Sequence, residues 1–177
     1  WSLGGQFALR AAAQAATPAR ALVLLNSTPR FLRQHDWPHG LEHSALQRFA
    51  TQLQDDQQQL LTDFLELQTR GSAHSASSLR LLRAALLEHG SAQPAALDAG
   101  LALLAGSDLR ALAAHVAIPA LVVGGQHDRV TPPGAARALA QLLPAARHIE
   151  LARAGHTPFL SHTDELVPVL RDFLAAA

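Results

Sequence analysis

The sequence predicts an α/β fold, with a mostly parallel sheet that is interrupted by one all-helical insertion. Short, unbroken apolar runs occur at residues 21–26 and 118–125, and such runs are typical of parallel strands covered on both faces. Residues 147–151 are interpreted as a third short strand. Helical patterns alternate with these runs, as they do in α/β proteins. The chain has 177 residues and 49% hydrophobic content, which is enough for one domain with a substantial core.

The core elements follow in order along the chain. Residues 3–16 are rich in alanine and predict a helix, which Pro18 ends. The first strand, residues 21–26, is closed by Asn26 and Pro29. The second strand, residues 118–125, precedes a helix over residues 133–143. The third strand, residues 147–151, precedes a last helix over residues 164–175, in which Pro168 is expected to cause a kink or a late start.

The helical insertion, residues 31–115, separates two core segments, residues 1–30 and 116–177. Its apolar residues between Leu46 and Leu67 recur at spacings of three, four and seven, which predicts an amphipathic helix. A Gly/Ser/His stretch at residues 71–75 ends this pattern. A second helix is predicted over residues 79–87, and a third from Pro94 to Gly106. We interpret the insertion as a cap over one edge of the sheet.

Composition excludes several classes of protein. The 14 basic and 14 acidic residues give a net charge of zero, which argues against a nucleic-acid partner. The chain has no cysteine, so disulfides and thiolate metal sites are excluded. No apolar run approaches the length of a membrane span, and no signal peptide is visible. We expect a cytoplasmic monomer with neither cofactor nor metal and with no membrane partner.

Three residues fit a catalytic triad. Ser2 precedes Leu3 and Gly4, which matches the end of the G-x-S-x-G turn that presents a nucleophilic serine. Asp128 follows the second predicted strand, and His156 follows the third. Ligands of parallel sheets bind beyond the carboxyl ends of the strands. A neutral imidazole can accept the serine proton there, while a carboxylate fixes its tautomer.

Each of these residues also has a simpler interpretation when taken alone. Ser2 would be solvated, Asp128 would be a turn residue, and His156 would be a loop histidine; their order and placement together favour the triad.

Two other histidines, His127 and His162, are interpreted as surface residues. A further group resembles metal ligands by number, but Pro38 and Gly40 interrupt it, so we interpret it as a polar loop; it comprises His35, Asp36, His39 and His43.

Four phrases of the sequence carry a resemblance to a known family. They are WSLGG at the start, FLELQT at residues 64–69, GGQHDRVTP around Asp128, and AGHTPFLSH around His156. With them the chain resembles the C-terminal two-thirds of the pimeloyl-[acyl-carrier protein] methyl ester esterases of biotin synthesis, within the α/β-hydrolase superfamily. The resemblance implies the α/β-hydrolase fold and hydrolysis of a methyl ester through an acyl-enzyme. The substrate would be a small acyl ester or an ester on an acyl carrier protein.

The resemblance also implies roles for individual residues. Ser2 would be the nucleophile, Asp128 the orienting carboxylate and His156 the general base and acid. The backbone N–H of Leu3 would supply half of the oxyanion hole. Further substrate contacts are implied at Trp1, Phe64, Leu67 and Gln68. The family also presents cap arginines to its acidic carrier protein. Here Gln59, Asp63 and Ala76 stand among the polar and small positions, which leaves Arg70, Arg80 and Arg83 for docking.

The first residue lies inside the predicted nucleophile turn, so we expect the chain to be part of a longer protein. The upstream part would hold the first strands and the second oxyanion donor, and the isolated chain would be inactive. Three alternatives stay open at this point: a general carboxylesterase or thioesterase of the same fold, an inactive fragment, and a non-catalytic binding protein on the hydrolase scaffold.

Overall fold

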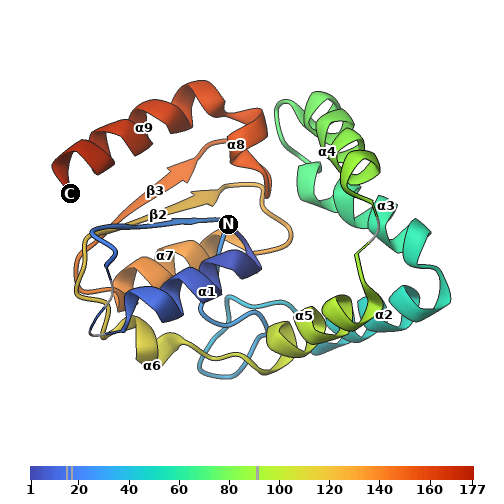
Figure 1. Ribbon diagram of the computed structural model, residues 1–177, viewed down its shortest axis with the longest axis horizontal. Coiled ribbons are helices and arrows are strands. Elements are labelled where there is room, and N and C mark those ends of the chain that lie inside the picture. Colours follow the sequence, from blue (N-terminus) through green and yellow to red (C-terminus); the bar gives the residue numbers. More distant parts are fainter. Residues whose placement is uncertain (15, 17, 91) are drawn as a thin grey trace.

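The computed structural model describes residues 1–14, 16, 18–90 and 92–177, and it is built around a three-stranded parallel sheet (Figure 1). The strands β1 (Leu22–Leu25), β2 (Ala120–Gly125) and β3 (Ala146–Leu151) lie in the order β1-β2-β3. Leu24 pairs with Val122, which pairs with His148. The predicted α/β class is therefore confirmed, and all three predicted strands are present.

Helices cover both faces of this sheet. On one face, α1 (Leu3–Ala12) and α7 (Pro133–Leu142) pack against strand residues such as Leu24 and Val122. On the other face, α9 (Thr163–Ala176) packs against Leu121 and Val123 (Figure 1). Neighbouring residues of β2 thus point into two different cores, because side chains alternate along a strand. This explains why the sequences of β1 and β2 are apolar throughout rather than alternating.

Most of the helical insertion lies beyond the carboxyl ends of the strands, on the side to which the arrows of β2 and β3 point (Figure 1). It contains α2 (His43–Asp55), α3 (Gln57–Thr69), α4 (Ser75–His89), α5 (Pro94–Gly106) and the short α6 (Arg110–Ala113). Its apolar side chains pack on the cluster of Phe31, Leu32 and Val130. Val130 follows β2, so this cluster joins the insertion to the end of the sheet.

Some predicted helix boundaries differ from the structure. The single helix expected between Leu46 and Leu67 is two helices, because the backbone turns at Asp56. The first helix ends at Ala12 instead of residue 16, and Ala15 of that prediction lies outside the described residues. The last helix begins at Thr163 and contains Pro168, so the predicted late start was wrong. The one-turn helix α8 (Pro158–Ser161) was not predicted.

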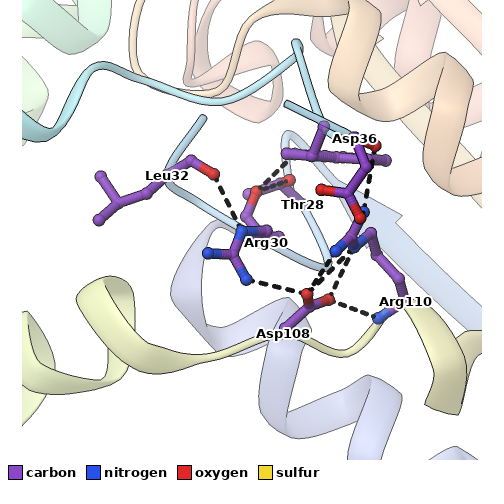
Figure 2. Close-up of polar contacts among 7 residues, drawn as sticks. Thr28, Arg30, Leu32, Asp36, Asp108 and Arg110 are labelled. Carbon is purple, nitrogen blue, oxygen red and sulfur yellow. Dashed lines mark hydrogen bonds and ion pairs between the residues drawn. The ribbon is translucent and has the colours of Figure 1, made fainter. Parts of the chain in front are cut away.

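A cluster of charged residues joins the two ends of the helical insertion. Arg30 and Asp108 pair across an isolated antiparallel bridge, and their side chains form an ion pair of 2.8 Å. Arg110 contacts Asp108 at 2.7 Å and Asp36 at 2.9 Å. Figure 2 shows both guanidinium groups directed at the Asp108 carboxylate. We call Arg30, Asp36, Asp108 and Arg110 the Asp108 cluster.

None of the described helices is long and apolar enough to span a membrane.

Candidate active site

Ser2 occupies a strained turn immediately before α1. Its φ of 52° lies in the left-handed region, which is unusual for a residue that is not glycine. The Ser2 N–H donates to the carbonyl of Leu25 at 3.1 Å, which ties the turn to the end of β1. The close approach also requires Gly5, because a Cβ there would overlap Ser27. The Ser2 side chain is consequently held at the carboxyl edge of the sheet.

Asp128 lies in the loop after β2, residues 126–132, which we call the Asp loop. Its Oδ1 accepts the backbone N–H groups of Val130 and Thr131 at 2.8 and 2.9 Å. Its Oδ2 accepts the Thr131 hydroxyl at 2.6 Å and the side-chain amide of Asn26. Burial raises the pKa of Asp128, but the hydrogen bond and charge of His156, with the other donors, outweigh burial and hold it below its usual value.

His156 lies in the loop after β3, residues 152–157, which we call the His loop, and its side chain is 1% exposed. Its Nδ1 is 2.8 Å from Asp128 Oδ2, and its Nε2 is 2.9 Å from Ser2 Oγ. Sequence analysis therefore selected three residues that the fold brings into one continuous chain of hydrogen bonds. The carboxylate accepts the Nδ1 proton, so Nε2 is free to accept a proton from the Ser2 hydroxyl.

Trp1 packs directly against the His loop. Its indole Nε1–H donates to the carbonyl oxygen of His156 at 2.7 Å. Its ring centroid is 5.3 Å from that of His156 and 5.1 Å from that of Phe159. Trp1 remains 41% exposed, so part of its ring is open to solvent beside Ser2.

The remaining predicted substrate contacts differ in their burial and in their neighbours. Leu3 is the first residue of α1, so its N–H has no acceptor within that helix. Gln68 is 3% exposed, and its backbone carbonyl accepts the N–H of His156 at 2.8 Å. Phe64 and Leu67 instead pack on the apolar cluster that includes Val130 of the Asp loop. Gln68 thus contacts His156, whereas Phe64 and Leu67 line the adjoining apolar region.

The three predicted docking arginines lie on the outside of α3 and α4. All are exposed, and Arg83 forms an ion pair of 2.8 Å with Glu66. Arg70 directly follows α3, and Arg80 lies in α4. Among the described residues, no hydrogen bond or ion pair joins any of these arginines to Ser2, Asp128 or His156.

The other histidines have separate environments. His127 is exposed, and its Nδ1 is 2.7 Å from the carbonyl oxygen of Gly71. His162 was wrongly interpreted as a surface residue: it is 7% exposed, and its Nδ1 is 2.7 Å from Ser161 Oγ. His39 packs edge-on against Trp37. Within the described ranges, no three His, Asp or Glu side chains lie close enough to share a metal ion.

Sequence reasoning missed Asn26 and Thr131, both of which hydrogen-bond to Asp128. Asn26 was noted only as the residue that closes the first strand. Its place directly after a strand was the same signal that selected Asp128 and His156. Because β1 and β2 are parallel neighbours, a polar residue at the end of β1 lies beside the loop after β2.

Several known proteins are similar to this chain. Residues 1–163 match the family model described as the alpha/beta hydrolase fold. A protein of Stenotrophomonas maltophilia (strain K279a), named pimeloyl-[acyl-carrier protein] methyl ester esterase, is 43% identical over 176 residues. The match covers 99% of this chain and 68% of that protein. A protein of the same name from Xanthomonas oryzae pv. oryzae (strain MAFF 311018) is also 43% identical, with 69% of its length covered.

Solved structures match the same fold. A bromoperoxidase from Bacillus anthracis superposes with a TM-score of 0.88 at 19% identity, and the match covers 99% of this chain and 65% of that one. The esterase EaEST from Exiguobacterium antarcticum gives a TM-score of 0.86 at 19% identity, with 99% and 65% covered. The chain thus spans slightly less than two thirds of the length of these solved structures.

Proposed function

The chain belongs to the α/β-hydrolase fold family, and from that premise we propose that its protein is a serine carboxylesterase. The observation that carries the proposal is the chain of hydrogen bonds from Ser2 through His156 to Asp128. We assign Ser2 as the nucleophile, His156 as the general base and acid, and Asp128 as the carboxylate that fixes the histidine tautomer. The strained turn at Ser2 supports this assignment, because strain of this kind is concentrated at functional sites.

The proposed reaction proceeds in two steps. Ser2 Oγ attacks the ester carbonyl while His156 Nε2 takes the hydroxyl proton, and the backbone N–H of Leu3 stabilises the oxyanion. The tetrahedral intermediate expels the alcohol, which leaves with the proton from His156. Water then attacks the acyl-enzyme with His156 as base. The free acid departs, and Ser2 recovers its proton.

For the substrate we propose the methyl ester of a pimeloyl group carried on an acyl carrier protein, with methanol as the leaving alcohol. The support is the identity of 43% to relatives that bear this name. The apolar side chains of Phe64 and Leu67 lie close to the site and suit an aliphatic acyl chain. Gln68 and Trp1 contact the His loop and are placed to border the ester group. A general carboxylesterase of the same fold is the alternative.

Substitution of the nucleophile tests the chemistry. We expect Ser2→Ala to abolish ester hydrolysis and labelling by a fluorophosphonate probe, with an unchanged circular dichroism spectrum. The nearby Ser27→Ala is not a suitable control, because its hydroxyl supports the Ser2 carbonyl at 2.8 Å. Ser77, exposed on α4, provides one: Ser77→Ala should leave both readouts unchanged. Hydrolysis that persists in Ser2→Ala would exclude the proposed mechanism.

We further propose that Arg70 and Arg80 receive the acidic carrier protein. Both are exposed on the α3–α4 side of the insertion, and neither has an ion-pair partner among the described residues. Arg83 is already paired with Glu66, so it contributes less. Positive charge on a protein surface accelerates and orients the docking of an acidic partner.

Charge reversal distinguishes a carrier-bound substrate from a simple ester. We expect Arg70→Glu and Arg80→Glu each to raise the KM for the carrier-bound ester by about 3- to 10-fold at low salt, and less at high salt. The KM for a small methyl ester should not change. Arg48→Glu, an equal charge change on α2, is the control. If all three variants behave alike, or if carrier-bound and small esters are hydrolysed equally well, the general esterase becomes the better assignment.

A further inference from the structure

Asn26 is a buried amide at the centre of the proposed active site, and the mechanism above gives it no role. Its side chain is 1% exposed. The Nδ2 group donates to Asp128 Oδ2, the same oxygen that receives Nδ1 of His156. It also lies 3.1 Å from the carbonyl oxygen of Gly155, the residue before His156. One amide group therefore contacts both the Asp loop and the His loop.

The backbone holds this amide in a fixed position. The Asn26 N–H donates to the carbonyl of Val123 at 2.8 Å, so the residue is joined to β2 as well as to β1. Its φ of 44° lies in the left-handed region. Asparagine adopts this conformation more readily than most residues, and the conformation turns the chain away from the strand at the site. Because the Asn26 backbone is already fixed, its side chain loses little further conformational entropy when it hydrogen-bonds to Asp128.

We propose that Asn26 is a positioning residue that sets the orientation and hydrogen-bonding strength of the Asp128 carboxylate and links the Asp loop to the His loop. This inference rests on the proposed function, because it concerns the carboxylate that is assigned to orient His156. Asn26 contacts no reacting atom in the structure, so it acts through Asp128 and Gly155.

Asn26 and His156 both contact Oδ2 of Asp128, so the Asn26 amide affects how strongly this oxygen binds His156. A donor on Oδ2 withdraws electron density that would otherwise strengthen the bond to His156 Nδ1. Without Asn26, Oδ2 would bind the imidazolium form of His156 more strongly, and the neutral base would be present only at higher pH. Among the described residues, Asp128 is the one charged side chain that hydrogen-bonds to Asn26, and it is also the one charged side chain that hydrogen-bonds to His156.

Two variants separate this role from a general effect on folding. Asn26→Gly removes the donor and keeps the left-handed backbone, which glycine adopts without strain. Asn26→Asp also tolerates that backbone, but it places a carboxylate against Asp128. Thr28→Val is the matched control, because Thr28 is a buried polar residue of the same segment whose hydroxyl bonds only to the Arg30 carbonyl among the described contacts.

We expect Asn26→Gly to lower kcat by about 10- to 100-fold, the range for loss of a hydrogen bond to a charged group, with KM within about twofold. The acidic limb of the kcat/KM profile should move to higher pH, and further in Asn26→Asp. Thr28→Val should keep the wild-type profile. A wild-type kcat and an unshifted limb in Asn26→Gly would overturn the inference, as would a loss of thermal stability alone. Failure of the proposed function would appear separately, as activity in Ser2→Ala.

Discussion

At the scale of single residues, Trp1 is coupled to the histidine through the backbone and the ring. Its indole N–H holds the His156 carbonyl at 2.7 Å, and its ring packs on the imidazole. The His156 N–H is held by Gln68 at 2.8 Å. Both polar groups of the His156 backbone therefore have partners outside the His loop, and this restricts how the imidazole can move relative to Ser2.

Removal of the indole donor tests this coupling. We expect Trp1→Phe, which keeps an aromatic ring, to lower kcat by about 3- to 10-fold, as the loss of one neutral hydrogen bond implies. Trp37→Phe is the matched control, because its indole also donates to a backbone carbonyl, that of Arg30, away from the site. Steady-state kinetics on a small ester measure both. Equal effects in the two variants would assign Trp1 to stability alone.

The candidate residues differ in whether the neighbouring sequence alone predicts their role. Ser2, Asp128 and His156 each follow or begin a recognisable element, so local patterns were sufficient to select them. Asn26 also directly follows a strand, but its role comes from contact with Asp128, which is 102 positions away, and that contact depends on β1 and β2 being neighbours in the sheet. His162 was misplaced for the same reason, since it lies between α8 and α9 and its ring faces that of the distant His74, with the centroids 6.2 Å apart.

At the scale of elements, periodicity predicted the helices but not where one ended. The apolar spacing continues through Asp56, whereas the structure divides it into α2 and α3. The Asp56 side chain accepts the N–H of Gln59 at 2.9 Å and thereby caps the second helix. Spacing reports which face of a helix is apolar, and that face continues across the break. Capping competes locally with helix continuation, and Asp is among the residues that favour it.

The connection between α3 and α4 explains how the insertion contacts the site. Backbone groups of this connection and of the end of α3 bond to the His loop: the Gln68 carbonyl accepts the His156 N–H at 2.8 Å, and the Ala73 N–H donates to the Arg153 carbonyl at 3.1 Å. The contact is close enough that a Cβ at Gly155 would lie 2.9 Å from the Gln68 carbonyl oxygen. Glycine is thus required before His156 by the insertion. Sequence alone presented this glycine only as part of a motif.

At the scale of the whole molecule, the Asp108 cluster fixes where the helical insertion leaves and re-enters the core. Arg30 precedes α2, and Asp108 follows α5, so their ion pair closes a loop of almost eighty residues. Arg110 binds the same carboxylate and also stacks near the Trp37 ring, 5.8 Å from its centroid. The hydrogen bond from the Arg110 side chain is the main reason that the pKa of Asp108 lies well below its usual value, despite partial burial.

Acid should therefore weaken the molecule through this carboxylate. The folded-state pKa of Asp108 is below its usual value, so its stabilisation is present above about pH 4 and is lost as the pH falls further. We expect Asp108→Asn to lower the free energy of unfolding by about 1–2 kcal/mol at pH 7, a range reduced for partial exposure. The difference should shrink towards pH 2, as measured by urea unfolding at several pH values. Glu150→Gln, which removes the more exposed ion pair with Arg137, is the control and should cost less than about 0.5 kcal/mol. A difference that stays constant with pH would show that Asp108 acts by packing rather than by charge.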